Sequence, residues 1–326
     1  MNAAMSWVLF GSIGAFGASL ALAQAPSYPA KAVRVIVPYN AGGQSDTLAR
    51  AVGQKLTERW GQPIIVENRA GAGGNIGAEY VARAAPDGYT LLTAEGAVFT
   101  VNPSLYKNLS WDPIKDFAPI TRLNFYASAL VVHPSVPARN VGEFIALARS
   151  KPGALNYATF GIGSGGHTAM EAFKLLQNID LVAVHYKGSA PAVVDLTAGR
   201  LATAFFSIAS AAPLVKAGKW RALGYAYPTR SPIFPDVPTF AEQGIPGFEV
   251  TSWFCLMAPA GTPRAIIGRI QQEVARVIKE PVFEEQWFTS KGMEAAGESP
   301  EELAALIRAE IPYWAKVIKA AGMTLE

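Results

Sequence analysis

Two glycine-rich loops carry the densest concentration of possible binding chemistry in this sequence. The first runs from Pro38 to Asp46 and the second from Phe160 to His167. Each lies between a predicted strand and a predicted helix. There the free N–H groups at a helix start, and the positive end of its dipole, favour an anion, and glycine allows close approach. The loops therefore predict capture of a small carboxylate, although the same glycines could serve only as tight turns.

The candidate ligand-binding residues come mainly from these two loops. From the first loop they are Tyr39, Asn40, Ala41, Gly42, Gly43 and Ser45, and from the second Gly161, Gly163, Ser164, Gly165, His167 and Thr168. Alternative roles are open for two of them. Ser45 is also a plausible helix N-cap, and His167, at a helix start, could be a capping or surface group instead of a donor to the ligand.

Three further candidates follow other predicted strand ends and could reach the same crevice. Asn75 closes a third glycine cluster, Arg69 to Asn75, and offers a side-chain donor. Ser207 offers a hydroxyl, or else caps a helix. Glu95 has three alternatives: it could repel an anionic ligand, pair with an ammonium group on the ligand, or face solvent.

Enzyme motifs are incomplete in this chain. Gly161, Gly163 and Gly166 satisfy G-x-G-x-x-G, but the acidic residue of a dinucleotide site, expected about twenty positions later, is missing. The sequence has no phosphate-binding G-x-x-x-x-G-K-[ST], and neither Ser45 nor Ser164 lies in G-x-S-x-G. We therefore expect no catalytic residue and no cofactor, and keep a secreted α/β hydrolase only as an alternative.

Metal and charge patterns add little to the anion-binding prediction. The three histidines, His133, His167 and His185, lack the spacing of a metal site. Lys187 follows a predicted strand and could steer an anion or simply be solvated. The net charge of +3 is spread over 326 residues without a basic run, so a nucleic-acid partner is not expected.

Strands and helices alternate along two blocks of the chain. The first block has strands at 33–37, 64–68 and 89–93 with helices at 46–60 and 75–84 between them. The second has strands at 155–159, 181–186, 202–206 and 221–226, with a helix through Phe173 and Leu176 and another at 190–198. Such alternation is typical of right-handed crossovers and a mainly parallel sheet. The sequence therefore predicts two α/β lobes, each a mainly parallel sheet flanked by helices.

Two extended segments are expected to join the lobes. Residues 120–133 contain no turn residue, and the proline-rich stretch 227–253 offers a return path. Two later helices begin at Thr262-Pro263 and at a capping box, Ser299 with Glu302, and should return to the first lobe. We assign residues 24–124 to the first part of lobe 1, 125–230 to lobe 2 and 231–326 to the crossover and the return to lobe 1. A double crossover makes a hinge, and the cleft beside it is the expected ligand site.

The N-terminal residues resemble an export signal. Residues 1–30 contain no Asp or Glu, and also lack the Lys or Arg usual at the start of a signal; Trp7 to Leu22 is apolar or small, ending in Ala21-Leu22-Ala23. This predicts a signal peptide at 1–23 and a periplasmic mature chain; a membrane anchor would need about twenty apolar residues. Cys255 is the single cysteine, so an internal disulfide is excluded.

An ordered set of motifs resembles one known family over the whole mature chain. The motifs include Val35-Ile36-Val37-Pro38, the string from Val66 to Gly77 (VENRAGAGGNIG), Pro86 to Leu91 (PDGYTL), Tyr186-Lys187-Gly188 and Ala258 to Pro263 (APAGTP). By these motifs the chain is similar to the substrate-binding proteins of tripartite tricarboxylate transporters, the Bug family of extracytoplasmic solute receptors.

The resemblance implies a type II periplasmic-binding-protein fold whose two lobes close over a ligand. Family members bind tricarboxylates, dicarboxylates, amino acids or aromatic acids through loop amides and bridging waters. The implied partners are the membrane subunits of a transporter, with presentation to a sensor as the alternative, and we expect a monomer. Two features depart from the family: Asn40-Ala41 replaces an apolar residue and a frequent proline, and Glu95 stands where small or hydroxyl residues are usual.

Overall fold

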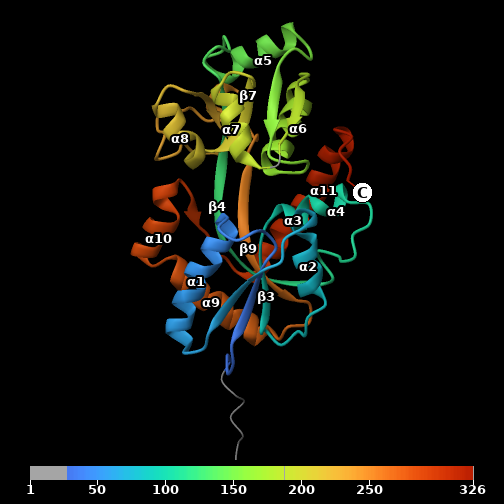
Figure 1. Ribbon diagram of the computed structural model, residues 1–326, viewed down its shortest axis with the longest axis vertical. Coiled ribbons are helices and arrows are strands. Elements are labelled where there is room, and N and C mark those ends of the chain that lie inside the picture. The colour runs from blue at the N-terminus through green and yellow to red at the C-terminus, as the bar shows by residue number, and fades with distance from the viewer. Residues whose placement is uncertain (1–27, 187, 326) are drawn as a thin grey trace, which may run out of the picture.

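The computed structural model describes residues 28–186 and 188–325, which form two α/β lobes stacked along the long axis of the molecule (Figure 1). The predicted signal peptide and Lys187 lie outside the described residues. No helix within the described ranges has the length and apolar character needed to span a membrane.

The first lobe is built on three parallel strands, β1 (Val33–Val37), β2 (Ile64–Asn68) and β3 (Thr90–Glu95), with β1 in the middle. Helix α1 (Gln44–Trp60) joins β1 to β2, and α2 (Asn75–Ala82) leads to β3. Leu48, Val52 and Leu56 recur every fourth residue on α1 and are all buried, which is why this segment is an amphipathic helix packed on the sheet.

The second lobe repeats this plan. Strands β5 (Asn156–Thr159), β6 (Val182–His185) and β7 (Thr203–Ser207) are parallel, with β5 in the middle. Strand β4 (Phe117–Val132) lies between β7 and β8 (Arg221–Tyr225). Its helices are α5 (Val141–Ser150), α6 (Gly165–Gln177), α7 (Ser189–Thr197) and α8 (Ile208–Lys216).

Two strands run along the crossover, and each adds an antiparallel member to the parallel strands of one lobe. In β4 (Phe117–Val132), residues up to Ala127 pair with β9 (Thr251–Pro259), and residues from Ser128 onward pair with β7 and β8. The return path meets β4 at Val250, whose carbonyl accepts a hydrogen bond from the Ser128 N–H at 3.2 Å. A mainly parallel sheet was expected in each lobe; an antiparallel strand joins each of them, β9 beside β3 in the first lobe and β4 beside β7 in the second.

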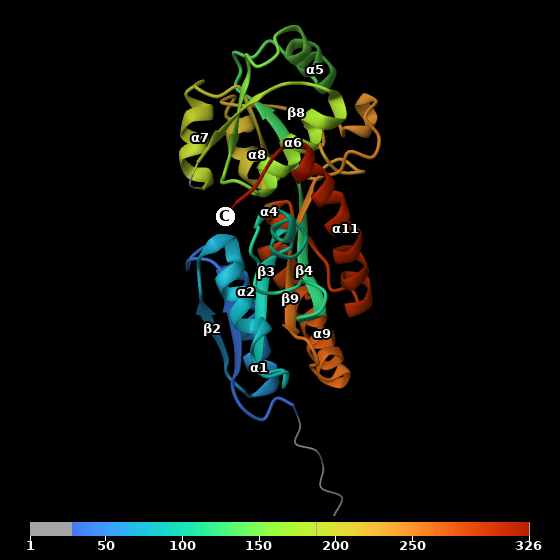
Figure 2. The same cartoon turned by 90° about the vertical axis from the view of Figure 1, so that its right-hand side faces the viewer.

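The C-terminal helices cover different parts of the molecule. Helix α9 (Arg264–Ile278) packs on the first lobe, as expected, and α10 (Pro281–Trp287), which was not predicted, packs there too. Helix α11 (Pro300–Ala320) instead contacts both lobes: Leu303 and Ile307 join a first-lobe core cluster, whereas Trp314, Val317 and Ile318 join the main core cluster of the second. Figure 2 shows α11 running alongside both lobes.

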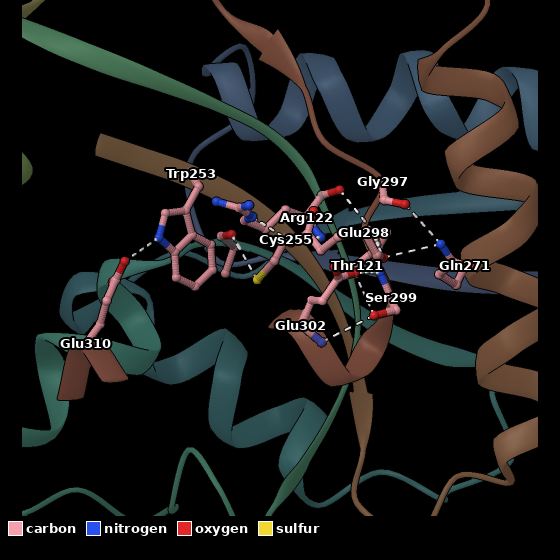
Figure 3. Close-up of polar contacts among 11 residues, drawn as sticks. Thr121, Arg122, Trp253, Cys255, Gln271, Gly297, Glu298, Ser299, Glu302 and Glu310 are labelled. Atoms are coloured by element: carbon pink, nitrogen blue, oxygen red, sulfur yellow. Dashed lines mark hydrogen bonds and ion pairs between the residues drawn. The ribbon is translucent and has the colours of Figure 1, made fainter. Parts of the chain in front are cut away.

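The start of α11 is fixed by polar contacts (Figure 3). The predicted capping box is confirmed: the Glu302 N–H donates to Ser299 Oγ, and the Ser299 N–H donates to the Glu302 carboxylate. Just before it, Arg122 of β4 pairs with Glu298, and Gln271 of α9 donates to the Gly297 carbonyl at 3.0 Å. The first turn of α11 is thereby tied to a crossover strand. The remaining short elements are α3 (Ala97–Thr100), α4 (Asn102–Leu105), β10 (Glu294–Ala295) and the 3₁₀ turns Ala72–Gly74, Ala241–Gln243 and Thr289–Lys291.

Candidate functional site

A cavity of about 330 Å³ lies between the two lobes, at the strand ends where the sequence places the site. Residues from both lobes line it: Tyr39, Gly73, Glu95, Ala97, Val98, Asn102 and Tyr106 from the first, and Phe160, Gly161, Ile162, Gly163 and Ser164 from the second. Its volume is in the range of pockets that hold small ligands.

The second glycine loop is held by its own side chains. Ser164 Oγ accepts a hydrogen bond from the Phe160 N–H at 3.2 Å, and His167 Nδ1 accepts one from the Gly163 N–H at 3.1 Å. Burial lowers the pKa of His167 to about 4, so the ring is neutral and can accept. Gly161 and Gly163 have φ of +130° and +79°, which only glycine adopts readily. His167 therefore shapes the loop and does not line the cavity.

The second loop also brings the N-terminus of α6 toward the first lobe. Ser164 precedes the helix in extended conformation, and its side chain does not cap the first-turn amides of α6. A methyl group placed on Gly163 would lie 2.3 Å from Leu105 Cδ2 of α4, so the loop and the first lobe are in direct contact there. Thr168 donates to the carbonyls of its own first turn.

The first glycine loop is anchored from behind by Asp46. Its carboxylate accepts from the Gly42 N–H at 2.9 Å and pairs with Arg50, and Asn68 Nδ2 bridges Asp46 to the Tyr39 carbonyl. The hydrogen bond from Arg50 lowers the pKa of Asp46. Tyr39 lines the cavity, whereas Asn40, Ala41, Gly42 and Gly43 are exposed and do not.

Three other candidates make contacts inside the protein instead of lining the cavity. Ser45 Oγ donates to the Thr93 carbonyl, and Ser207 is the N-cap of α8. Asn75 Oδ1 accepts a hydrogen bond from Asn102 Nδ2 at 2.7 Å, and the same amide donates to the Gly73 carbonyl at 3.1 Å. Asn75 thus positions Asn102, a cavity residue that the sequence analysis missed.

Glu95 lies at the end of β3 and lines two cavities. Besides the larger one, it lines a cavity of about 20 Å³, together with Gly165 and Thr168 from α6, Trp253 from β9 and Glu310 from α11. This smaller space has room for about one water molecule. Burial raises the pKa of Glu95 to about 7. Glu95 is therefore a partly buried wall residue of both cavities, and its role toward a ligand stays a prediction.

Glu310 faces the small cavity from α11. Its Oε1 accepts a hydrogen bond from Trp253 Nε1 at 3.1 Å (Figure 3), and burial raises its pKa. No helical signal in the sequence marks Glu310 as a cleft residue, because its position depends on α11 crossing from one lobe to the other. Asn102 and Tyr106 were missed for a related reason: α3 and α4 have four residues each, too few for a periodic pattern.

The comparison with protein families identifies the chain over most of its length. Residues 48–323 match the family described as tripartite tricarboxylate transporter family receptor. Protein BugT of Bordetella pertussis is 34% identical over 322 residues, which cover 98% of this chain and 98% of BugT.

Two solved structures are similar to the present one across almost the whole chain. A Rhodopseudomonas palustris protein solved with adipate has a TM-score of 0.79 and 36% identity, covering 91% of this chain and 99% of its own. The periplasmic binding protein BugD has a TM-score of 0.76 and 31% identity, covering 92% of this chain and 100% of its own. The two-lobed periplasmic-binding-protein fold expected from the sequence is thereby confirmed. The chain belongs to the tripartite tricarboxylate transporter receptor family.

Proposed function

We propose that the protein is a periplasmic receptor that captures a small carboxylate between its lobes, leaves it chemically unchanged and delivers it to the membrane subunits of a tripartite tricarboxylate-type transporter. The observation that carries this proposal is the cavity of about 330 Å³ shared by Tyr39 of the first loop and Gly161 to Ser164 of the second. Export through a cleaved signal at 1–23 and action as a monomer are parts of the same proposal.

The polar groups around the cavity suit capture of an anion better than catalysis. Ser164 and His167, the residues that a hydrolase would use as nucleophile and base, hold the backbone of the second loop. The first-turn amides of a helix have no partner within the helix, and the N-cap residue Ser164 does not cap those of α6 with its side chain. They can therefore hold a carboxylate, and the adipate found with the Rhodopseudomonas relative supports this ligand class.

A thermal-shift screen tests the proposal directly. Protein shown to be ligand-free by native mass spectrometry is mixed with dicarboxylates, tricarboxylates, aromatic acids and amino acids. A binder at about a hundred times its Kd should stabilise the fold by roughly 2.7 kcal/mol and raise the Tm. A flat response to the whole panel would count against carboxylate capture, and pull-down of the membrane subunits with and without the binder tests delivery.

Substitution of Gly165 by valine is expected to weaken binding of that carboxylate at least about tenfold, which is about 1.4 kcal/mol. A Cβ at Gly165 would lie 2.9 Å from Ser252 Oγ of β9, so the valine side chain pushes α6 away from the crossover strand when the lobes close. Isothermal titration calorimetry measures the effect.

Gly268→Val is the matched control, because a Cβ at Gly268 on α9 meets no atom within 4 Å. Its affinity should stay at the wild-type value. Equal affinities of the Gly165 and Gly268 variants would remove the start of α6 from the closing surface.

A further inference from the structure

We infer that the ligand of the inter-lobe cavity carries an ammonium group besides its carboxylate, and that Glu95 receives the ammonium. This inference rests on the proposed capture of a carboxylate and narrows its ligand class. It starts from the position of Glu95, the one charged side chain among the described residues that lines the larger cavity.

Glu95 faces the second lobe from the opposite wall of the cleft. It ends β3, and a methyl group placed on Gly165, the first residue of α6, would lie 3.9 Å from Glu95 Oε1. Glu95 and Gly165 both line the smaller cavity, so a ligand in the larger cavity would lie beside them and meet Glu95 on one side and the loop that leads into α6 on the other. The amide end of α6 favours a carboxylate, and the Glu95 carboxylate favours a cation.

Within the part of the chain that the structure describes, the charges that line the cleft have one sign. Among the described residues, the only charged side chains lining the two cavities are Glu95 and Glu310, and none is Lys, Arg or His. Like charges within a few ångströms repel one another, and the repulsion grows when water is excluded. A second carboxylate on the ligand, placed near β3, would therefore oppose lobe closure, and an ammonium there would favour it.

The two glutamates differ in how far their hydrogen bonding is satisfied. Glu310 accepts a hydrogen bond from Trp253 Nε1. The Glu95 carboxylate has no hydrogen-bond donor among residues 28–186 and 188–325, and burial is what raises its pKa. An ionised carboxylate that is buried without a partner costs free energy, which a bound cation offsets. Glu95 is thus the group in the cleft that gains most from a cationic ligand.

Neighbouring side chains leave the charge of Glu95 uncompensated. Tyr39 and Tyr126 lie close to it: burial first, and then the negative charge of Glu95, raise the pKa of both phenols. Both therefore stay neutral in the physiological range. Ser252, beside Gly165, adds only a hydroxyl. A ligand that matches the charges on the two sides of the cavity is therefore a small molecule with one cationic end and one anionic end.

Matched pairs of compounds test the inference on ligand-free wild-type protein. The pairs are 6-aminohexanoate against adipate, L-glutamate against glutarate, and L-phenylalanine against 3-phenylpropionate, each titrated by calorimetry at pH 8. We expect the amine-bearing member of at least one pair to bind at least about tenfold more tightly than its partner. Equal or tighter binding of the amine-free members would overturn the inference and leave carboxylate capture standing. If no compound of any pair binds, the inference is also overturned. The thermal-shift screen of the broader panel then decides whether the protein captures a carboxylate at all.

Variants at Glu95 show whether this side chain causes the preference. Glu95→Gln removes the charge and keeps the size, so the advantage of the amine-bearing member should fall at least about tenfold, while affinity for the amine-free member holds or rises. Glu95→Asp keeps the charge, so it should retain part of the preference for the amine-bearing compound. This variant also tests the inference if Glu95→Gln folds poorly.

Glu79→Gln is the matched control. Glu79 lies on α2, outside both cavities, and pairs with Arg83, so its loss should leave the preference unchanged. An amine preference that persists in Glu95→Gln at the wild-type level would assign it to another residue and contradict the inference.

Discussion

Replacement of Trp253 by alanine is expected to lower the free energy of unfolding by about 3–5 kcal/mol, the cost of emptying a well-packed tryptophan site. Trp253 is 2% exposed and belongs to the core cluster that contains Phe99 and Leu303. Its ring lies against the turn after β3 so closely that a methyl group on Gly96 would be 2.3 Å from Trp253 Cε2. The truncation also removes the indole N–H that donates to Glu310, an acid whose pKa burial raises.

Urea unfolding followed by circular dichroism measures this loss. Trp253→Phe is the matched control, since it keeps an aromatic ring in the site and removes the indole N–H; it should cost much less than the alanine variant. A loss below about 1 kcal/mol for Trp253→Ala would mean that the site collapses around the smaller side chain, and that Trp253 does not hold β3, β9 and α11 together.

The position of Trp253 connects stability to the cleft. The Gly96 N–H donates to the Trp253 carbonyl at 2.8 Å, so the turn that follows Glu95 is fixed to the crossover strand β9. On its other side the indole reaches Glu310 of α11, the helix that contacts both lobes. Trp253 therefore lines the smaller cavity and also holds the turn that follows Glu95.

The fold could be predicted for elements whose local sequence pattern also determines where they pack in the tertiary structure. The strands 33–37 and 64–68 have the bounds expected from their β-branched runs, and α1 follows from apolar residues on one face. The capping box at Ser299 is a purely local device. By contrast, the course of α11 could not be predicted, because its two halves pack on different lobes and either half alone reads as a helix on one domain.

The candidate site could be predicted to the level of the strand ends, and no further. Both glycine loops lie at the expected edge, but the structure brings only Tyr39 of the first loop to the cavity. Asp46 and Asn68 bind that loop from behind and fix which residues face outward. Such long-range contacts have no signature in the loop itself. Asn102 and Tyr106 reach the cavity through short helices that only the packed structure reveals.

Glu95 should make the stability of the ligand-free protein fall as the pH rises from about 4.5 to above 7. Its pKa is about 7 in the folded state, against 4.5 as the ordinary value, so the native state holds a proton that the unfolded chain releases in this window. Stability decreases with pH wherever the native state binds more protons than the unfolded state. At about 1.4 kcal/mol per pKa unit, the complete loss attributable to Glu95 approaches roughly 3 kcal/mol at pH 8.

Glu95→Gln removes this titrating group. The free energy of unfolding of the variant, relative to that of the wild type, should therefore rise by up to about 3 kcal/mol between pH 4 and pH 8. Urea unfolding at both pH values measures the gain as a difference between proteins, which subtracts titrations common to both. Glu310, whose pKa is also raised by burial in the small cavity, titrates in the same direction and is retained in the variant. The Glu79→Gln control should show no gain.

A pH-independent difference between Glu95→Gln and the wild type would mean that Glu95 ionises at its ordinary pKa. In that case closure of the lobes carries no charge penalty at Glu95 for a cationic ligand to offset.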